Sequence, residues 1–329
     1  MLTQTIQAGQ KSGAIDEGSA KRVAVDTTVM EKNIAYPTDA RLYERARGQL
    51  VELAQEAGVD LRQSYARLAP RLALQVGRYA HAKQFKRMRK ALKGLKGYTG
   101  RVMRDLRRHL QDIPEGGLRD RIIAKLAVVS QLLHQQPKGG DKIYALHEPE
   151  VDCISKGKAR VRYEFGCKVS VTTTLDEGFV VGMRSFPGNP YDGHTLRDAL
   201  GQVEILTDQR PALAVVDRGY RGHDEGKTRV LISGTRRGLP AKEIIDRQRR
   251  SAIGVEIGHM RTDGRLSRSP LKGTLRDAVF AVLKAYGHNI RKSWPTSELG
   301  LHGLSPSYGP PKPRQTAAAL LQMQRESFV

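Results

Sequence analysis

Two short apolar runs, far apart in the sequence, each end in an aspartate, and this pair constrains the fold more than any other feature. The run 212–216 contains Val215 and Val216 and is followed by Asp217 and a glycine-bearing turn, which predicts a buried strand. The run 22–25 leads in the same way into Asp26. Because α/β folds place their chemistry at the carboxyl ends of buried strands, we expect the two aspartates to form one site.

The composition favours a polyanionic partner. The 329 residues carry a formal net charge of +22, and an excess of this size is typical of proteins that bind nucleic acid. No run of about 18 apolar residues is present, and the first residues form no apolar leader, so we expect neither a membrane span nor secretion. Cys153 and Cys167 lack the spacing of zinc ligands, which favours a reduced, cytoplasmic setting.

The order of expected elements predicts an α/β fold, a mixed sheet flanked by helices with a large all-helical insertion after the first strand. We divide the chain into an N-terminal segment with the first catalytic strand (1–38), a basic helical insertion (39–138), the remainder of the catalytic domain (139–292) and a Pro/Gly-rich, poorly ordered tail (293–329). Periodicity and turn signals predict strands at 21–29, 142–146, 163–174, 179–184, 212–217 and 228–232, and helices at 39–57, 61–95 with an interruption at Pro70, 101–110, 118–136, 194–206, 242–260 and 274–292.

The insertion contains a stretch of nearly uniform positive charge. Residues 78–108 include twelve Lys and Arg and a single Asp. A solvated helix face is one interpretation, but like charges one helical turn apart repel each other unless a counter-ion is present. We therefore predict that this stretch contacts the phosphate backbone of DNA. The residues expected to do so are Lys86, Arg87, Lys90 and Lys93.

Two neighbouring carboxylates need a cation between them, because otherwise they repel. Carboxylate oxygens suit Mg²⁺ or Mn²⁺, and such ions activate a water or hydroxyl and stabilise a leaving oxygen at a phosphodiester. A third acidic ligand is expected from the helix after the second aspartate strand, where residues 247–261 offer only Glu256. The candidate catalytic and metal-binding residues are therefore Asp26, Asp217 and Glu256.

Several stretches together resemble the DDE transposases of insertion sequences, in the group named after insertion sequence five. They occur in the family's order and cover most of residues 1–292. The matching stretches are VDTTVMEKNIAYPTDARL (25–42), KIYALHEPEVDCISKGKARVRYEFGCKVS (142–170), PGNPYDGHTL (187–196), VVDRGYRG (215–222), RRSAIGVEIGHMRTDGRLSRSPLKGT (249–274) and GHNIRK (287–292).

The resemblance implies an RNase H-like fold with the helical block inserted after its first strand, and Mg²⁺-dependent cleavage and strand transfer in DNA transposition. Asp26 and Asp217 would be metal ligands. The family's third signature, a tyrosine, arginine, glutamate and lysine at fixed spacing, places its arginine on Arg250 and its lysine on Arg261. Its glutamate then falls on Gly254. Glu256 lies two residues on, about 200° around a helix, and remains the only candidate carboxylate there.

The remaining expectations concern DNA and partners. Arg218 and Arg221 flank the second aspartate and are expected to hold phosphates, while Arg250 and Arg261 are expected to contact DNA ends. Tyr220 is expected to pack at the edge of the site. The resemblance also implies double-stranded DNA (element ends and target) as partner, a homo-oligomer, and a bacterial, nucleoid-associated location. Because few residues precede Asp26, we interpret the chain as an N-terminally truncated copy.

Three interpretations remain open. The first is a transposase, active or inactive in this copy. The second is a catalytically dead remnant that binds element DNA and competes with or represses a full-length transposase. The third is a nuclease of the same fold that uses Glu256 as its third carboxylate.

Overall fold

The structure is a computed structural model that describes residues 1–136, 139–140, 142–155, 162–234 and 240–293. The predicted tail, from residue 294 onward, lies outside these ranges. The helices and strands are α1 (Leu2–Lys11), β1 (Arg22–Lys32), α2 (Asp39–Glu56), α3 (Leu68–His81), α4 (Phe85–Arg108), α5 (Gly117–His134), β2 (Asp152–Ile154), β3 (Glu164–Thr174), β4 (Val180–Phe186), α6 (Asp192–Thr207), β5 (Leu213–Val216), β6 (Arg229–Ile232), α7 (Ala241–Arg249), α8 (Ala252–Thr262), β7 (Arg268–Ser269) and α9 (Thr274–Ser293).

The strands form one mixed sheet around β1. On one side β1 pairs antiparallel with β3, and β3 in turn pairs antiparallel with β2 near its start and with β4 along its remainder. On the other side β1 pairs in parallel with β5 at its beginning and with β7 at its end, and β6 pairs in parallel with β5. The described part of the chain is thus an α/β protein with a mixed sheet flanked by helices, as the sequence predicts.

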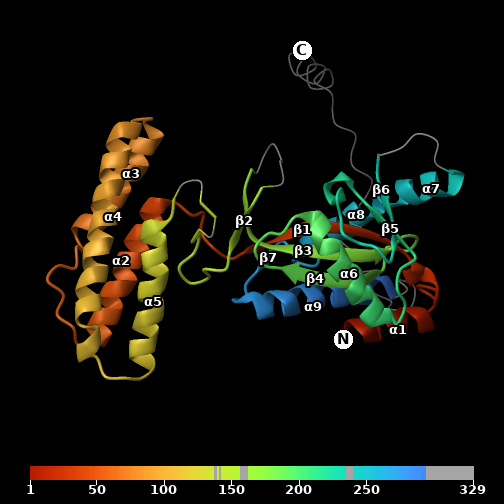
Figure 1. The fold of residues 1–329 in the computed structure, drawn as a ribbon, viewed down its shortest axis with the longest axis horizontal. Helices are drawn as coiled ribbons and strands as arrows, with labels where there is room; N and C mark the ends of the chain where they lie inside the picture. Colours follow the sequence, from red (N-terminus) through yellow and green to blue (C-terminus); the bar gives the residue numbers. More distant parts are fainter. Residues whose placement is uncertain (137–138, 141, 156–161, 235–239, 294–329) are drawn as a thin grey trace, which may run out of the picture.

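Helices pack against the sheet and bury its central strand. Val23, Val25 and Val29 of β1 are inaccessible to solvent. Helices α6 and α9 pack against β4, α8 packs against β1, and α1 lies against α9 (Figure 1). The side chain of Asn289 fixes α9 to the edge strand, since its amide accepts a hydrogen bond from the Val180 N–H and donates one to the Val180 carbonyl.

The helices α2 to α5 form a block inserted between β1 and β2, and Figure 1 shows this block to one side of the sheet. It has a hydrophobic cluster of its own, in which Leu50, Leu95, Leu106 and Ile122 are inaccessible to solvent. Thr38 begins the block as an N-cap, because its hydroxyl accepts a hydrogen bond from the backbone of α2.

Two predicted helix boundaries within the block are wrong. Pro70 does not interrupt a helix, because it lies in the first turn of α3, where its missing N–H would have no intrahelical partner. The chain breaks instead at residues 82–84, where Lys83 adopts a φ of +55°. The predicted break between residues 95 and 101 is also absent, because α4 continues through Gly97 and Gly100.

Two further predictions need correction. The predicted strand 142–146 does not form. Ile143 and Leu146 instead pack into the hydrophobic cluster of the helical block, so the apolar residues of this segment are buried without pairing in the sheet. The predicted helix 242–260 is divided into α7 and α8. Arg250 and Ser251 keep right-handed helical angles at the division, but the hydrogen bonds there tighten to the i+3 pattern.

A buried ion cluster holds the end of β1. The ammonium of Lys32 lies 2.7 Å from a Glu148 carboxylate oxygen and 2.6 Å from an Asp277 oxygen, and it also donates to the Leu271 carbonyl. Burial alone would lower the pKa of Lys32, but its hydrogen bonds to Asp277 and Glu148 outweigh this and raise it. The cluster therefore ties β1 to α9 and to the segment that returns from the helical block.

Candidate functional site

The parallel register between β1 and β5 brings the two predicted aspartates together. Ala24 pairs with Val215, so Asp26 and Asp217 both follow two residues later and point to the same face. Asp26 lies in β1 beyond its last partner on β5, and Asp217 comes directly after β5 and caps the short turn Arg218–Tyr220. The two aspartates therefore lie close together, as the sequence predicts, but Asp26 does not end its strand, because β1 continues to Lys32.

Arg250, at the junction of α7 and α8, lies between the two carboxylates. Its Nη2 is 2.8 Å from Oδ2 of Asp26 and 3.7 Å from Oδ2 of Asp217. The Oδ1 atoms have backbone donors, since Thr27 N–H donates to Asp26 and Gly219 N–H donates to Asp217. The guanidinium thus supplies the positive charge that the carboxylate pair requires.

A cavity of about 580 Å³ opens at this point, and both aspartates line it. It lies beside the part of β1 between Ala24, the last residue that pairs with β5, and Glu31, the first residue that pairs with β7. Asp192, from the first turn of α6, lines the same cavity and accepts hydrogen bonds from Thr27 and from Lys168, whose ammonium is 2.8 Å away.

Asp192 and Lys168 were missed as site residues, although both lie in stretches that resemble the transposase family. An added Cβ at Gly219 would lie 2.9 Å from Oδ1 of Asp217 and 3.3 Å from Oδ2 of Asp192, so the two carboxylates flank one point. A carboxylate in the turn-rich 187–196 stretch was the available signal, but only the fold shows that α6 begins beside the turn that follows β5.

Tyr220 lies beneath the acidic residues and is inaccessible to solvent, in agreement with its predicted packing role. Burial, and then the charges of Asp26, Asp192 and Asp217, raise the pKa of its phenol well above the ordinary value. The phenol is therefore neutral beside the carboxylates.

The inclusion of Glu256 in this site is wrong. Its carboxylate faces α9, where one oxygen is 2.9 Å from Nε2 of His288 and the other is 2.5 Å from the Lys292 ammonium. Burial alone would raise the pKa of Glu256, but the bonds with His288 and Lys292 outweigh it and lower the pKa. Glu256 fails as a ligand because it lies two residues from Gly254, on a different face of α8.

Gly254 itself lies one turn after Arg250, on the helix face that also carries Arg261. An added Cβ at Gly254 would meet no atom within 4 Å. Across the described ranges, no group of three or more His, Cys, Asp or Glu is arranged to hold a metal ion. The predicted three-ligand set is therefore reduced to Asp26 and Asp217, with Asp192 as a neighbour.

The predicted DNA-contacting arginines near the site differ in their surroundings. Arg218 and Arg221 are exposed beside Asp217, and Arg218 donates only to the Gly234 carbonyl among the described residues. Arg261 instead reaches inward, donating to the Thr28 hydroxyl and lying 3.5 Å from a Glu164 carboxylate oxygen. Arg218 and Arg221 are accordingly the better placed to meet a phosphate.

The basic stretch of the insertion forms an exposed stripe on α4. Lys86, Arg87, Lys90 and Lys93 are exposed, and within the described part of the chain none of them forms an ion pair with a carboxylate. A cavity of about 380 Å³ beside the stripe is lined by Arg89, Lys93, Lys96 and Lys142 together with the ends of α2 and α5. Exposed cations on one helix face, such as Lys86, Arg87, Lys90 and Lys93, are the expected footprint of a phosphate backbone.

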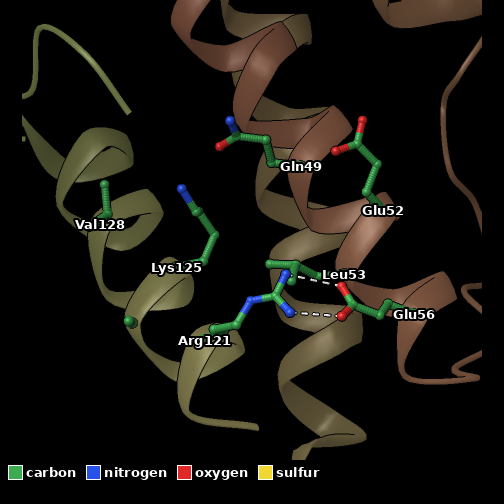
Figure 2. Close-up of a pocket in the computed structure, with 8 residues that line it drawn as sticks. Gln49, Glu52, Leu53, Glu56, Arg121, Lys125 and Val128 are labelled. Atoms are coloured by element: carbon green, nitrogen blue, oxygen red, sulfur yellow. Dashed lines mark hydrogen bonds and ion pairs between the residues drawn. The ribbon is translucent and has the colours of Figure 1, made fainter. Parts of the chain in front are cut away.

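A separate groove lies between α2 and α5, and Figure 2 shows the residues that line it. Arg121 and Glu56 close one end through two hydrogen bonds of 2.7 and 3.1 Å. Lys125 donates to the Leu146 carbonyl, and burial lowers its pKa. These contacts join the two helices, and the groove contains no pair of groups suited to catalysis.

Comparisons with known proteins give one partial relative. The chain is 49% identical over 85 residues to "Uncharacterized protein ORF8 in nfe locus" of Rhizobium meliloti, an alignment that spans 26% of this chain and 41% of that protein. No family model matches the chain, and no solved structure matches it. Within the described ranges, none of the helices combines the length and apolar character that crossing a membrane requires.

Proposed function

We propose that this chain is a DNA transposase of the DDE class, in which Asp26 and Asp217 form the reactive centre. The observation that carries the proposal is the juxtaposition of these two carboxylates around a single cationic group. The mixed sheet, with its antiparallel and parallel pairs on opposite sides of β1, is compatible with the RNase H-like fold that the resemblance implies.

The donor atoms fit a hard divalent cation. Mg²⁺ is commonly held by one or two carboxylates together with substrate phosphates, and Asp26 and Asp217 offer such oxygens at the mouth of one cavity. A Mg²⁺ or Mn²⁺ ion there would activate the attacking oxygen and stabilise the leaving one at a phosphodiester. These two aspartates would hold the ion.

The other residues of the site would position the DNA. Arg218 and Arg221 lie exposed beside Asp217, where guanidinium groups can bind the phosphates that flank the scissile bond. Lys168 keeps Asp192 in place through the ion pair at 2.8 Å. The α4 stripe lies in the separate helical block and would bind the backbone away from the reacting centre, without reading sequence.

The second candidate is a protein that binds element DNA without cutting it. It is favoured by the absence of a carboxylate at Gly254 and by the commitment of Glu256 to α9. Both candidates share the basic surface, and they differ in whether the aspartates act on the bound DNA.

The test uses a labelled duplex that carries the ends of the DNA element encoding the chain. We expect the full-length protein to bind this duplex in EDTA and to nick it when Mg²⁺ or Mn²⁺ is added. Asp26→Asn and Asp217→Asn keep the side-chain shape and should retain binding but lose nicking. Binding without nicking by the unchanged protein would favour the second candidate, and nicking that survives both substitutions would refute the proposed centre.

A further inference from the structure

The Oδ2 atoms of the two site aspartates both face Arg250. The Nη2 atom of Arg250 lies 2.8 Å from Oδ2 of Asp26, which is hydrogen-bonding distance, and 3.7 Å from Oδ2 of Asp217. These are the oxygens that a cation shared by Asp26 and Asp217 would also approach, since the Oδ1 atoms are engaged by backbone N–H groups. A divalent ion and the guanidinium therefore compete for one place.

The competition is unavoidable because the charge of an arginine is permanent. A guanidinium stays protonated at every pH at which a protein is folded, so loss of a proton cannot remove its charge from the metal position. It can leave only by moving to another anion. In the DNA-free protein, Arg250 thus neutralises the carboxylate pair and opposes the binding of a metal ion.

The hold of the aspartates on Arg250 is incomplete. Its Nε is buried and has no hydrogen-bond partner within the described part of the chain. The Arg250 side chain is 20% exposed, so solvent and an incoming anion can reach it. A phosphate group can bind two N–H groups of a guanidinium at once, which is a better match than the single close contact seen here.

We propose that Arg250 is an exchangeable counter-ion that couples DNA binding to metal binding. Without DNA it bridges Asp26 and Asp217 and keeps metal affinity low. A phosphate of the bound DNA takes the guanidinium away, and the freed carboxylates then accept the divalent ion. By linkage, DNA raises the affinity for metal by the same factor that metal raises the affinity for DNA. The inference rests on the proposed function, because it assumes that the two aspartates are metal ligands.

The test measures Mn²⁺ binding to the DNA-free, full-length protein by electron paramagnetic resonance. Arg250→Gln should bind Mn²⁺ about tenfold more tightly than the unchanged protein, since the competing charge is gone. The matched control is Arg249→Gln, because Arg249 is the adjacent arginine but pairs with Asp176 instead of the site aspartates. The control should bind Mn²⁺ as the unchanged protein does.

A second measurement uses the unchanged protein alone and so does not depend on the folding of Arg250→Gln: a short duplex should raise its Mn²⁺ affinity. Where Arg250→Gln folds, its gain on adding the duplex should be smaller. Equal Mn²⁺ affinity in the unchanged protein and Arg250→Gln, or no gain on adding DNA, would overturn the exchange while leaving the cleavage test unaffected. Absence of Mn²⁺ binding in every variant would overturn the exchange and the proposed metal site together.

Discussion

Placing a carboxylate at Gly254 is the substitution that tests the geometry of α8 most directly. The position is exposed, lies one turn after Arg250, and has no atom within 4 Å of an added Cβ. Arg250 reaches Asp26 and Arg261 reaches Thr28, so this face of α8 is directed at β1 on both sides of Gly254. We therefore expect Gly254→Glu to fold and to direct its carboxylate toward the edge of the aspartate site.

The expected gain in stability follows from the local helix. Glycine in a helix costs about 1 kcal/mol relative to alanine, while glutamate costs only a few tenths. An acidic residue in the first turn of a helix adds about 0.3–1 kcal/mol through the helix dipole. Since Gly254 is the third residue of α8, both terms apply and together give about 1 kcal/mol. For an unfolding unit of about 150–250 residues this raises Tm by about 2–4 °C.

The assay is thermal unfolding with and without Mn²⁺. Without metal, Gly254→Glu should show the modest rise in Tm. With Mn²⁺ the rise should be larger than in the unchanged protein, because a third carboxylate tightens binding and ligand binding stabilises the folded state. The control is Gly258→Glu, one turn further along α8, where an added Cβ also meets open space. It should gain helix stability without the additional response to Mn²⁺.

Two results would refute this reasoning. A lower Tm for Gly254→Glu, with Gly258→Glu unaffected, would show that position 254 is not open in the folded protein. An equal Mn²⁺ response in both variants would show that a side chain at position 254 does not reach the aspartates.

Three further predictions concern other parts of the molecule. Lys32→Met leaves two buried carboxylates without their cation and should lower the free energy of unfolding, measured in urea, by about 3–5 kcal/mol; a loss below about 1 kcal/mol would show that the carboxylates find other partners. Glu256→Gln should cost about 1–2 kcal/mol at pH 7. Because the folded pKa of Glu256 is lowered below 4.5, its contribution is present above pH 4.5 and is lost as pH falls through that lower pKa, so urea midpoints of variant and unchanged protein should converge in acid. The slope of log affinity for duplex DNA against log salt is negative, and replacing Lys90 and Lys93 by alanine should reduce its magnitude by about 2. Lys11→Ala on α1 should leave this slope unchanged.

Local pattern was sufficient to predict most of the elements. The β-branched run before Asp217 and its counterpart before Asp26 became parallel neighbours, and the helical periodicity after Thr38 gave α2. The helix boundaries that failed are those at which a residue type that usually breaks helices is accommodated within one. Pro70 fits the first turn of α3, and α4 runs through Gly97 and Gly100 without a break.

The sequence by itself determined that two apolar runs each lead into an aspartate, that the chain is strongly basic, and that residues 78–108 carry nearly uniform positive charge. These follow from residue type and from spacing within a single element. Only the tertiary structure decided which charges meet. The positions of Arg250 between the aspartates, of Asp192 at the same cavity, and of Glu256 against α9 depend on contacts between elements far apart in the chain. Sequence periodicity fixes the face of an element on which a side chain lies, but the partner of that face is set by strand register and helix packing.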